Sequence, residues 1–226
     1  LVSVEALARW SNERLGNVSP VKFIAIAEDT GLIHDIGLFV FRIACEDMMR
    51  YSANGENAIK VSINISPRQL LEDSFSEDFL KIISDVGIDI ERVNLEITEN
   101  VLINDIEKVT PTLQMLRNLG FGISLDDFGT GYSSLSYLNN LPITEIKIDR
   151  CFIDKLLLSE QSNTLIRAII AIGASSGMQV VAEGVETEDQ YKELIAYGCS
   201  LIQGYYIDRP LPIEKLIERE DGQVRA

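Results

Sequence analysis

Short apolar segments with the spacing of β-strands alternate with amphipathic helices along this chain of 226 residues. Within the segments, apolar side chains recur at every second position, as expected for a strand with one buried face. The predicted strands are 1–10, 61–66, 93–98, 121–127, 145–149, 179–183 and 201–205. Strands that alternate with helices form βα units and a parallel sheet. Seven short strands of this kind favour a (β/α) barrel over an open sheet.

Start and stop signals for helices lie between these strands. Ser19-Pro20 and Ser66-Pro67 each place an N-cap residue before a proline at the first helical position. Thr187 has a glutamine three residues later, which is the spacing of a capping box. The predicted helices run from 20 to the break at Gly31, from there to about 51, and over 75–86, 105–119, 165–176, 187–198 and a last stretch after Pro212.

The length of the chain fits one large domain. A barrel of eight βα units usually takes about 250 residues, whereas this sequence provides seven strands and starts inside one of them. We therefore predict an α/β fold, a (β/α)8 TIM-like barrel that residues 1–226 form as a single domain. We expect its first strand, a helix and any regulatory domain to lie outside this chain.

The charge balance restricts the ligands that the chain can attract. It has 20 Lys and Arg against 35 Asp and Glu, a formal net charge of -15. Such a field repels the backbone of DNA or RNA and anionic lipid surfaces, so we expect no nucleic-acid polymer as a partner. An anionic ligand would need cations or a few well-placed basic side chains to overcome this repulsion.

Cysteine and histidine usage restricts the compartment and the chemistry. Cys45, Cys151 and Cys199 lie far apart without a CxxC pair, which is typical of free thiols in a reducing compartment. The single histidine, His34, excludes a histidine-rich metal site. No apolar stretch reaches transmembrane length and no signal peptide is recognisable. We expect a cytoplasmic location, although the parent protein could be anchored to a membrane through regions outside this chain.

A polar residue recurs among apolar neighbours within nearly every predicted strand. These residues are Glu5, Asn64, Glu96, Asp126, Lys147, Glu183 and Gln203. One of them alone could be a hydrogen-bonded core group. In a barrel, however, the carboxyl ends of the strands form the face that carries the active site, and seven such residues favour a functional site there.

The residue types at these strand ends suit divalent cations. Glu5, Asn64, Glu96 and Asp126 are oxygen donors that could surround one Mg²⁺ or Mn²⁺. Asp127 beside Asp126 invites a second cation, although an isolated Asp-Asp pair before a glycine loop is more often a solvated turn. Two cations about 3.5–4 Å apart stabilise both the attacking and the leaving oxygen of a phosphoryl displacement.

Two basic side chains complete a phosphate site in this interpretation. Lys147 is a point charge that could hold a phosphoryl oxygen, and the planar guanidinium of Arg9 suits a phosphate. The period of two would place Arg9 on the same strand face as Glu5. The residues alone therefore predict a metal-dependent phosphoester hydrolase.

Ordered motifs run across essentially the whole chain. They are Glu5-Ala6-Leu7 with Ala8-Arg9-Trp10, FIAIAEDTGLI at 23–33, Asn64-Ile65-Ser66, 96–99, DDFGTGYSSL at 126–135, Lys147-Ile148-Asp149, AEGVET at 182–187 and Gln203-Gly204-Tyr205. Together they resemble the EAL-domain family, bacterial phosphodiesterases of cyclic di-GMP. The resemblance implies hydrolysis of cyclic di-GMP to linear pGpG in bacterial signalling that includes biofilm formation. It implies two Mg²⁺ or Mn²⁺ ions per active site.

The resemblance also implies a role for each matching residue. The ligands of the first cation are Glu5, Asn64, Glu96 and Asp126, and those of the second are Asp126 and Asp127. Lys147 and Glu183, with Glu5, are the catalytic residues, and the first two position and activate the attacking water. Glu99 anchors the loop after Asp127, and the residues on the substrate side are Leu7, Arg9, Glu186 and Gln203.

Three further expectations concern partners and cations. The resemblance implies a homodimer, and we expect an upstream sensory or GGDEF domain in the parent protein. Calcium is expected to inhibit, because its larger and looser coordination shell misplaces the nucleophile.

Two departures from the family pattern and three alternatives accompany this interpretation. The family's Tyr-Gln-Pro segment, which touches substrate, would precede residue 1, and Cys151 stands where serine is common, a neutral change. One alternative is a catalytically inactive EAL domain that only binds cyclic di-GMP, although such domains usually lose metal carboxylates. Another is a metal-dependent barrel isomerase. The Asp127-Phe128-Gly129 triplet is not a kinase motif here, since no HRD-type loop or glycine-rich strand accompanies it.

Overall fold

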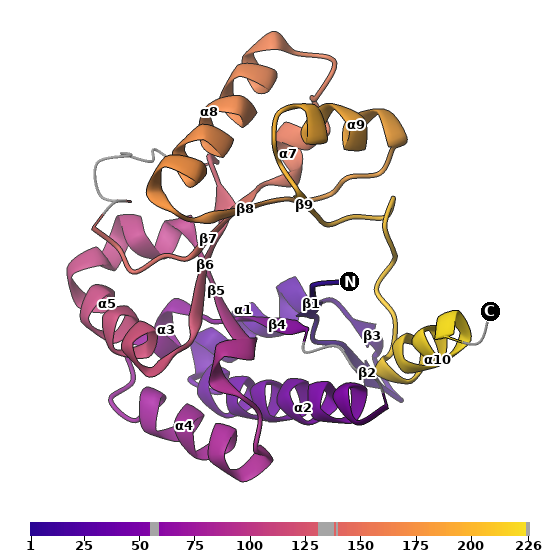
Figure 1. Cartoon of the computed structure of the whole chain (residues 1–226). Coiled ribbons are helices and arrows are strands. Elements are labelled where there is room, and N and C mark those ends of the chain that lie inside the picture. The colour runs from indigo at the N-terminus through magenta and orange to yellow at the C-terminus, as the bar shows by residue number, and fades with distance from the viewer. Residues whose placement is uncertain (55–58, 131–137, 139, 225–226) are drawn as a thin grey trace. The chain divides into compact units, whose positions relative to one another are not determined.

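The larger sheet of this computed structural model contains seven strands in the order β1-β4-β5-β6-β7-β8-β9 (Figure 1). Each strand of this sheet lies beside the strand that precedes it in the sheet's chain order. The structure describes residues 1–54, 59–130, 138 and 140–224. The strands are β1 Ser3–Ala6, β4 Lys60–Asn64, β5 Val93–Thr98, β6 Gly122–Phe128, β7 Glu145–Ile148, β8 Gln179–Ala182 and β9 Leu201–Ile202. The pairs β1–β4, β6–β7, β7–β8 and β8–β9 are parallel. The α/β class is confirmed.

Contacts within the chain divide it into two compact units. The first unit comprises Leu1–Leu95, Asn118–Phe121 and Leu211–Ala226, and the second comprises Glu96–Arg117 and Gly122–Pro210. The boundary crosses β5 after Leu95. The predicted single domain over residues 1–226 stays a prediction.

The first unit packs helices around the β1–β4 pair. Its helices are α1 Pro20–Thr30, α2 Ile33–Asn54, α3 Pro67–Leu70, α4 Phe75–Val86, the 3-10 turn η1 Ile90–Arg92 and α10 Ile213–Val224. α4 runs beside α2 (Figure 1), and the ring centroids of Phe41 and Phe79 lie 4.0 Å apart where the two helices meet. Both rings are fully buried, so aromatic burial stabilises this helix pair.

The second unit carries four parallel strands, from β6 to β9, and the helices that precede or connect them. Those helices are α5 Glu99–Leu119, α7 Arg150–Ile153, α8 Glu160–Ser176 and α9 Glu188–Ala196. α8 packs against β8 (Figure 1). A Cβ atom at Gly173 would lie 2.2 Å from Cγ2 of Val180, so a side chain at this position would push α8 off the strand.

The N-terminal strand differs from its prediction. The predicted strand 1–10 ends at Ala6, and a missed antiparallel hairpin follows, β2 Trp10–Asn12 and β3 Gly16–Val18. Oδ1 of Asn12 accepts hydrogen bonds from the backbone N–H groups of Arg14 (2.9 Å) and Leu15 (3.2 Å), and Gly16 has φ +67°. An asparagine turn that ends in a left-handed glycine reverses the chain here, which alternation alone did not predict.

Two other boundaries also differ. α5 begins at Glu99 instead of residue 105 and contains Pro111 in its interior. β9 ends at Ile202, so the predicted strand 201–205 is too long. At Gly204 the chain has φ +154°, and a Cβ there would lie 2.2 Å from the backbone oxygen of Val185. This close approach of two backbones ends the strand and requires glycine.

The other predicted elements agree with the structure to within a few residues. The start signal at Ser66-Pro67 is confirmed by α3, although the extent of this short helix was not predicted, and α7 was not predicted at all. Within the part of the chain that the structure describes, no helix is both long and apolar enough to span a membrane.

Candidate active site

A buried lysine in the second unit contacts three carboxylates. Lys147 lies on β7 with 1% of its surface exposed. Its Nζ lies 2.6 Å from Oε1 of Glu183, 2.9 Å from Oε1 of Glu96 and 3.6 Å from Oδ1 of Asp126. These carboxylates come from the end of β8, from β5 and from β6. We call the four residues the lysine cluster.

The lysine cluster carries more negative than positive charge. Glu96 and Lys147 are almost inaccessible to solvent, whereas the side chains of Asp126 and Glu183 are 14% and 17% exposed. A buried charge is tolerated when it is paired, and removing one partner is costly. Because one ammonium faces three carboxylates, the cluster is suited to accept further positive charge.

The carboxylates are not arranged as a ready-made metal site. Among the described residues, no group of three or more His, Cys, Asp or Glu side chains has the arrangement needed to hold a metal ion. The ammonium of Lys147 is instead the cation that three of the predicted site carboxylates share. The predicted cation ligands therefore stay predictions.

Asp127, the second residue of the Asp126-Asp127 pair on β6, has an unusual backbone conformation. Its φ is +56°, a region that Asp and Asn tolerate better than other side chains. Its backbone N–H donates to Oδ1 of Asp126 at 2.9 Å. Burial, the charge of Asp126 and a side-chain hydrogen bond with Asp149 raise the pKa of Asp127 to about 6. The two neighbouring carboxylates thus repel each other, which a bound cation would relieve.

Asp149 belongs to this site although sequence reasoning did not assign it. Burial alone would raise its pKa, but hydrogen bonds from the thiol and backbone N–H of Cys151 lower it. Its Oδ1 accepts from that N–H at 2.8 Å and so caps α7. A usable signal was present, since Asp149 is the polar residue that directly follows β7.

Asp127→Asn is expected to change how stability depends on pH. A carboxyl whose folded pKa is raised favours the folded state below its unfolded pKa, and that contribution is lost as pH rises through about 6. For this half-buried group we expect the wild type to lose about 1 kcal/mol relative to D127N between about pH 4 and pH 6.5. Urea unfolding of both proteins in EDTA measures this difference, and parallel pH curves would contradict it.

Glu99 contacts the loop that follows Asp127. It lies at the start of α5 with 1% of its surface exposed, and its Oε2 accepts a hydrogen bond from the backbone N–H of Gly129 at 2.9 Å. The predicted DDFGTGYSSL motif continues into residues 131–135, which lie outside the described residues. Glu99 therefore touches the described beginning of the loop that it was predicted to anchor.

The first unit brings together two other predicted ligands. Nδ2 of Asn64, at the end of β4, donates to Oε1 of Glu5 on β1 at 2.8 Å. The parallel register of β1 and β4 places Glu5 opposite Ser62, two residues before Asn64. The neighbouring Ser66 is held by Glu28, whose Oε1 accepts from its hydroxyl at 2.6 Å. The Glu5–Asn64 pair thus joins the neighbouring parallel strands β1 and β4 near their carboxyl ends.

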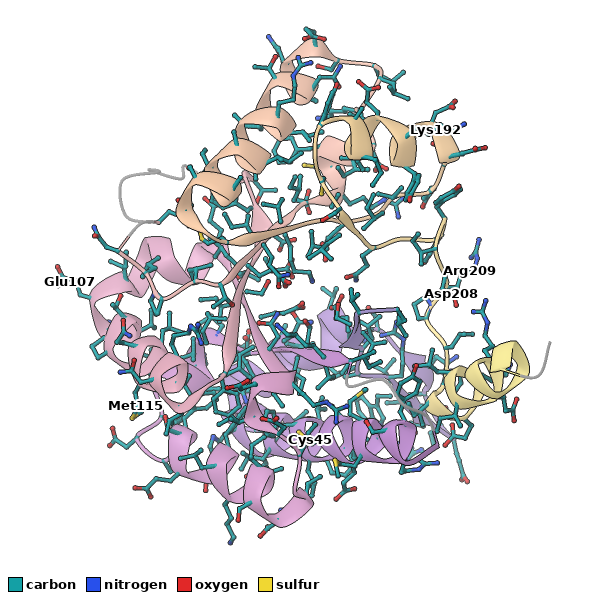
Figure 2. The ribbon with its side chains drawn as sticks, in the orientation of Figure 1. Cys45, Glu107, Met115, Lys192, Asp208 and Arg209 are labelled. Carbon is teal, nitrogen blue, oxygen red and sulfur yellow. The ribbon has the colours of Figure 1, made fainter. Side chains whose placement is uncertain are left out.

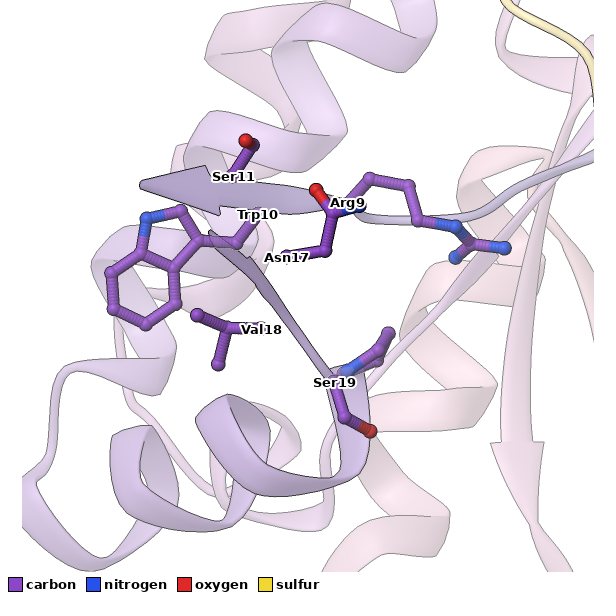
Figure 3. A pocket seen from close by; sticks show the side chains of 7 residues that line it. Arg9, Trp10, Ser11, Asn17, Val18 and Ser19 are labelled. Atoms are coloured by element: carbon purple, nitrogen blue, oxygen red, sulfur yellow. The ribbon is translucent and has the colours of Figure 1, made fainter. Parts of the chain in front are cut away.

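Arg9 does not lie where the alternation placed it, and Leu7 directly follows the end of β1. Since β1 ends at Ala6, Arg9 is not part of that strand, and the inference that it shares a strand face with Glu5 is wrong. Leu7 is 42% exposed. Arg9 lines an open pocket with the hairpin and the start of α1, and its guanidinium extends away from the indole of Trp10 (Figure 3). Its Nη1 donates to the carbonyl of Ala8 at 3.0 Å.

The last two predicted substrate residues lie in the second unit near the ends of β8 and β9. Oε1 of Glu186 lies 2.8 Å from Nη2 of Arg150, an ion pair that the sequence analysis missed. The backbone N–H of Gln203 donates to the carbonyl of Ala182 at 2.9 Å, and its carbonyl accepts from Val185 at 3.1 Å. The loop that carries Glu183 and Glu186 therefore contacts α7 through Arg150 and the segment after β9 through Gln203.

Comparisons with known proteins identify similar chains. The model of the EAL domain matches residues 1–210. The chain is 40% identical, over 94% of its length, to the cyclic di-GMP phosphodiesterase PA2567 of Pseudomonas aeruginosa, covering 36% of that protein. It is 37% identical, over 96% of its length, to the bifunctional diguanylate cyclase/cyclic di-GMP phosphodiesterase MucR of the same organism, covering 32% of it.

A solved structure supports the fold. The PaMucR phosphodiesterase in complex with c-di-GMP is 38% identical and gives a TM-score of 0.91, with 96% of this chain and 87% of that chain covered. This similarity confirms the predicted TIM-like barrel fold of the EAL type. The chain spans about a quarter to a third of the length of the curated relatives it matches.

Proposed function

Because this chain belongs to the EAL-domain family, we propose that it hydrolyses cyclic di-GMP to linear pGpG in a reaction that requires divalent cations. Relatives that are 37–40% identical are named as cyclic di-GMP phosphodiesterases. The observation that carries the proposal for this chain is the lysine cluster, in which Lys147 contacts Glu96, Asp126 and Glu183. No residue matched to a catalytic role in the family is replaced.

The donor atoms of the proposed ligands suit Mg²⁺ or Mn²⁺ by their chemistry, although among the described residues no group of three acidic side chains is arranged to hold a metal ion. All the candidate ligands are oxygen donors, which these hard cations prefer, and the raised pKa of Asp127 reflects burial and excess negative charge. In the proposal, the first cation is held by Glu5, Asn64, Glu96 and Asp126, and the second by Asp126 and Asp127. When bound, the cations would polarise the reacting oxygens and neutralise developing charge on the phosphate.

We assign the proton-transfer step to Lys147 and Glu183. The Lys147 ammonium, 2.6 Å from Glu183, fixes the carboxylate of that residue. Glu183 accepts a proton from the attacking water, whose oxygen bonds to phosphorus while the bond from phosphorus to the ribose O3′ breaks. The O3′ oxygen takes up a proton from solvent and Glu183 releases its proton to solvent, so that the net addition of one water gives linear pGpG.

The substrate-side residues have separate roles in the proposal. Arg9 carries an exposed guanidinium suited to a phosphate, and Leu7, Glu186 and Gln203 would contact the rest of the dinucleotide. Lys147 would supply positive charge beside Glu183, the proposed base. The anionic substrate can approach a chain of net charge -15 only where such groups and the cations offset the field.

Product analysis tests the proposal. Cyclic di-GMP is incubated with the chain and Mn²⁺ or Mg²⁺, the nucleotides are separated by chromatography, and the substrate affinity is measured by calorimetry. We expect pGpG to accumulate. Binding without turnover would instead support the alternative of a catalytically inactive cyclic di-GMP receptor, and neither binding nor turnover would refute both.

Calcium is expected to inhibit this reaction. Ca²⁺ takes six to eight oxygen ligands at longer distances than Mg²⁺, so it would misplace the attacking water. Addition of Ca²⁺ to the Mg²⁺-dependent assay should lower the rate by about tenfold or more, and excess Mg²⁺ should restore it. A rate that Ca²⁺ supports as well as Mg²⁺ would contradict this ligand assignment.

Two partners belong to the proposal as well. We expect the chain to form a homodimer, which analytical ultracentrifugation would test. The parent protein is expected to carry an upstream sensory or GGDEF domain. The relative MucR, named as both a diguanylate cyclase and a phosphodiesterase, is an example of a longer protein with two activities.

A further inference from the structure

One glutamine makes hydrogen bonds in two directions beside the loop of Glu183. Gln190 lies in the first turn of α9, and its backbone N–H donates to Oγ1 of Thr187 at 3.2 Å. Its Oε1 accepts from the backbone N–H groups of Glu186 (2.9 Å) and Thr187 (3.1 Å). These bonds form a capping box, which ends the loop and begins the helix.

The other half of the same amide reaches a different element. Nε2 of Gln190 donates to the backbone carbonyl of Ile153 at 3.1 Å, a part-buried bond between positions 37 residues apart. Ile153 is the last residue of α7, and its carbonyl also accepts from the backbone N–H of Leu156 at 3.1 Å. The capping box alone would need no such bond, so Gln190 also joins α9 to α7.

The two elements joined in this way follow the two central catalytic candidates. α7 begins three residues after Lys147, and the loop that Gln190 ends begins with Glu183. The backbone N–H of Glu183 also donates to the carbonyl of Ile148 at 3.2 Å. A fixed spacing between α7 and this loop therefore bears on the 2.6 Å contact of Lys147 with Glu183.

A second link between the same segments is weaker. Arg150 on α7 pairs with Glu186, and its stem covers Gly184, where an added Cβ would lie 2.5 Å from Cγ of Arg150. Both charged side chains of this pair are more than a third exposed, and exposed ion pairs stabilise little. Gln190, whose amide nitrogen makes a part-buried bond to α7 while its oxygen accepts from the loop backbone, is the better candidate to hold the loop.

We propose that Gln190 is a positioning residue that holds the loop of Glu183 against α7 and thereby keeps the Glu183 carboxylate at the Lys147 ammonium. The consequence for activity rests on the proposed function, whereas the consequence for the loop does not. Misplacement of a catalytic group by about 1 Å can cost about 100-fold in rate. Gln190 would thus act on the reaction without touching the substrate.

Gln190→Glu separates the two roles of this side chain. The carboxylate has the same shape and still accepts from the two backbone N–H groups, and a negative charge is favourable in the first turn of a helix. It has no N–H to donate, so it faces the carbonyl of Ile153 without a bond. We expect an unchanged melting temperature, a kcat lowered by about 10- to 100-fold and a KM within about twofold of the wild type.

Amide hydrogen exchange of residues 183–187 gives a readout that is independent of activity. We expect exchange in this segment to be about tenfold faster in Q190E, since the loop loses its attachment to α7. The matched control is Gln161→Glu, the same change at an exposed position in the first turn of α8. This control is expected to leave kcat and the exchange of residues 183–187 unchanged.

Two results would overturn the proposal. One is a Q190E variant with wild-type kcat and wild-type exchange of residues 183–187. The other is a Q190E variant whose lower kcat is accompanied by a lower melting temperature, which would make Gln190 only a helix cap. A wild-type chain without hydrolysis would refute the proposed function alone, and the exchange measurement would still decide whether Gln190 holds the loop.

Discussion

Lys147→Met is expected to lower the free energy of unfolding by about 3–5 kcal/mol at neutral pH and to abolish hydrolysis. The substitution keeps an unbranched apolar stem but removes the ammonium that contacts Glu96, Asp126 and Glu183. Three carboxylates, one of them almost inaccessible to solvent, are then left without this counter-charge. Breaking a buried ion pair from one side costs far more than the pair itself contributes, because the remaining charge stays buried.

Lys192→Met is the matched control for this prediction. Lys192 pairs with Glu188 on α9 at 2.8 Å, but its side chain is 64% exposed, and Figure 2 shows it on the outside of that helix. Exposed pairs of this kind contribute about 0.5 kcal/mol or less. Urea unfolding of both variants in EDTA measures the contrast. Equal losses of stability would mean that the lysine cluster is not a buried charge site.

Glu5→Gln is expected to lower kcat by at least about 100-fold with a change of less than about 1 kcal/mol in the free energy of unfolding. Glutamine has the same shape and can still accept the hydrogen bond from Nδ2 of Asn64. It lacks the negative charge that the proposed first cation requires. Activity should therefore fall although the fold is retained, which is the signature of a lost ligand.

Glu13→Gln is the control for Glu5. Glu13 lies exposed in the turn between β2 and β3, and the same chemical change there removes a surface charge only. The rate of pGpG formation and the Mn²⁺ concentration for half-maximal rate should both stay at wild-type values. If Glu5→Gln and Glu13→Gln were equally active, Glu5 would not be a cation ligand.

Alternation of apolar and polar residues predicted the strands that matter for function. β5, β6, β7 and β8 lie within one or two residues of their predicted bounds. Three of the residues singled out at their ends, Glu96, Asp126 and Glu183, contact the fourth, Lys147. The prediction succeeded because neighbouring parallel strands end at the same edge of a sheet, so polar residues near those ends converge.

Features that depend on turns and on distant partners were not predictable from alternation. The hairpin after β1 depends on the Asn12 side chain and the left-handed Gly16, so Arg9 was placed on a strand that ends before it. Asp127 at φ +56° breaks the alternation beside Asp126. The contacts of Asp149 with Asp127 and of Gln190 with Ile153 join residues far apart in sequence. A single sequence carries no record of such pairings.

The most direct test of this account is a titration of the metal-free chain with Mn²⁺ while pGpG formation from cyclic di-GMP is followed by chromatography. The account predicts no product in EDTA, a rate that rises and saturates with Mn²⁺, and no such rise in the Glu5→Gln or Asp126→Asn variants. Product formation at the full rate in EDTA, or equal Mn²⁺ activation of both variants, would contradict it.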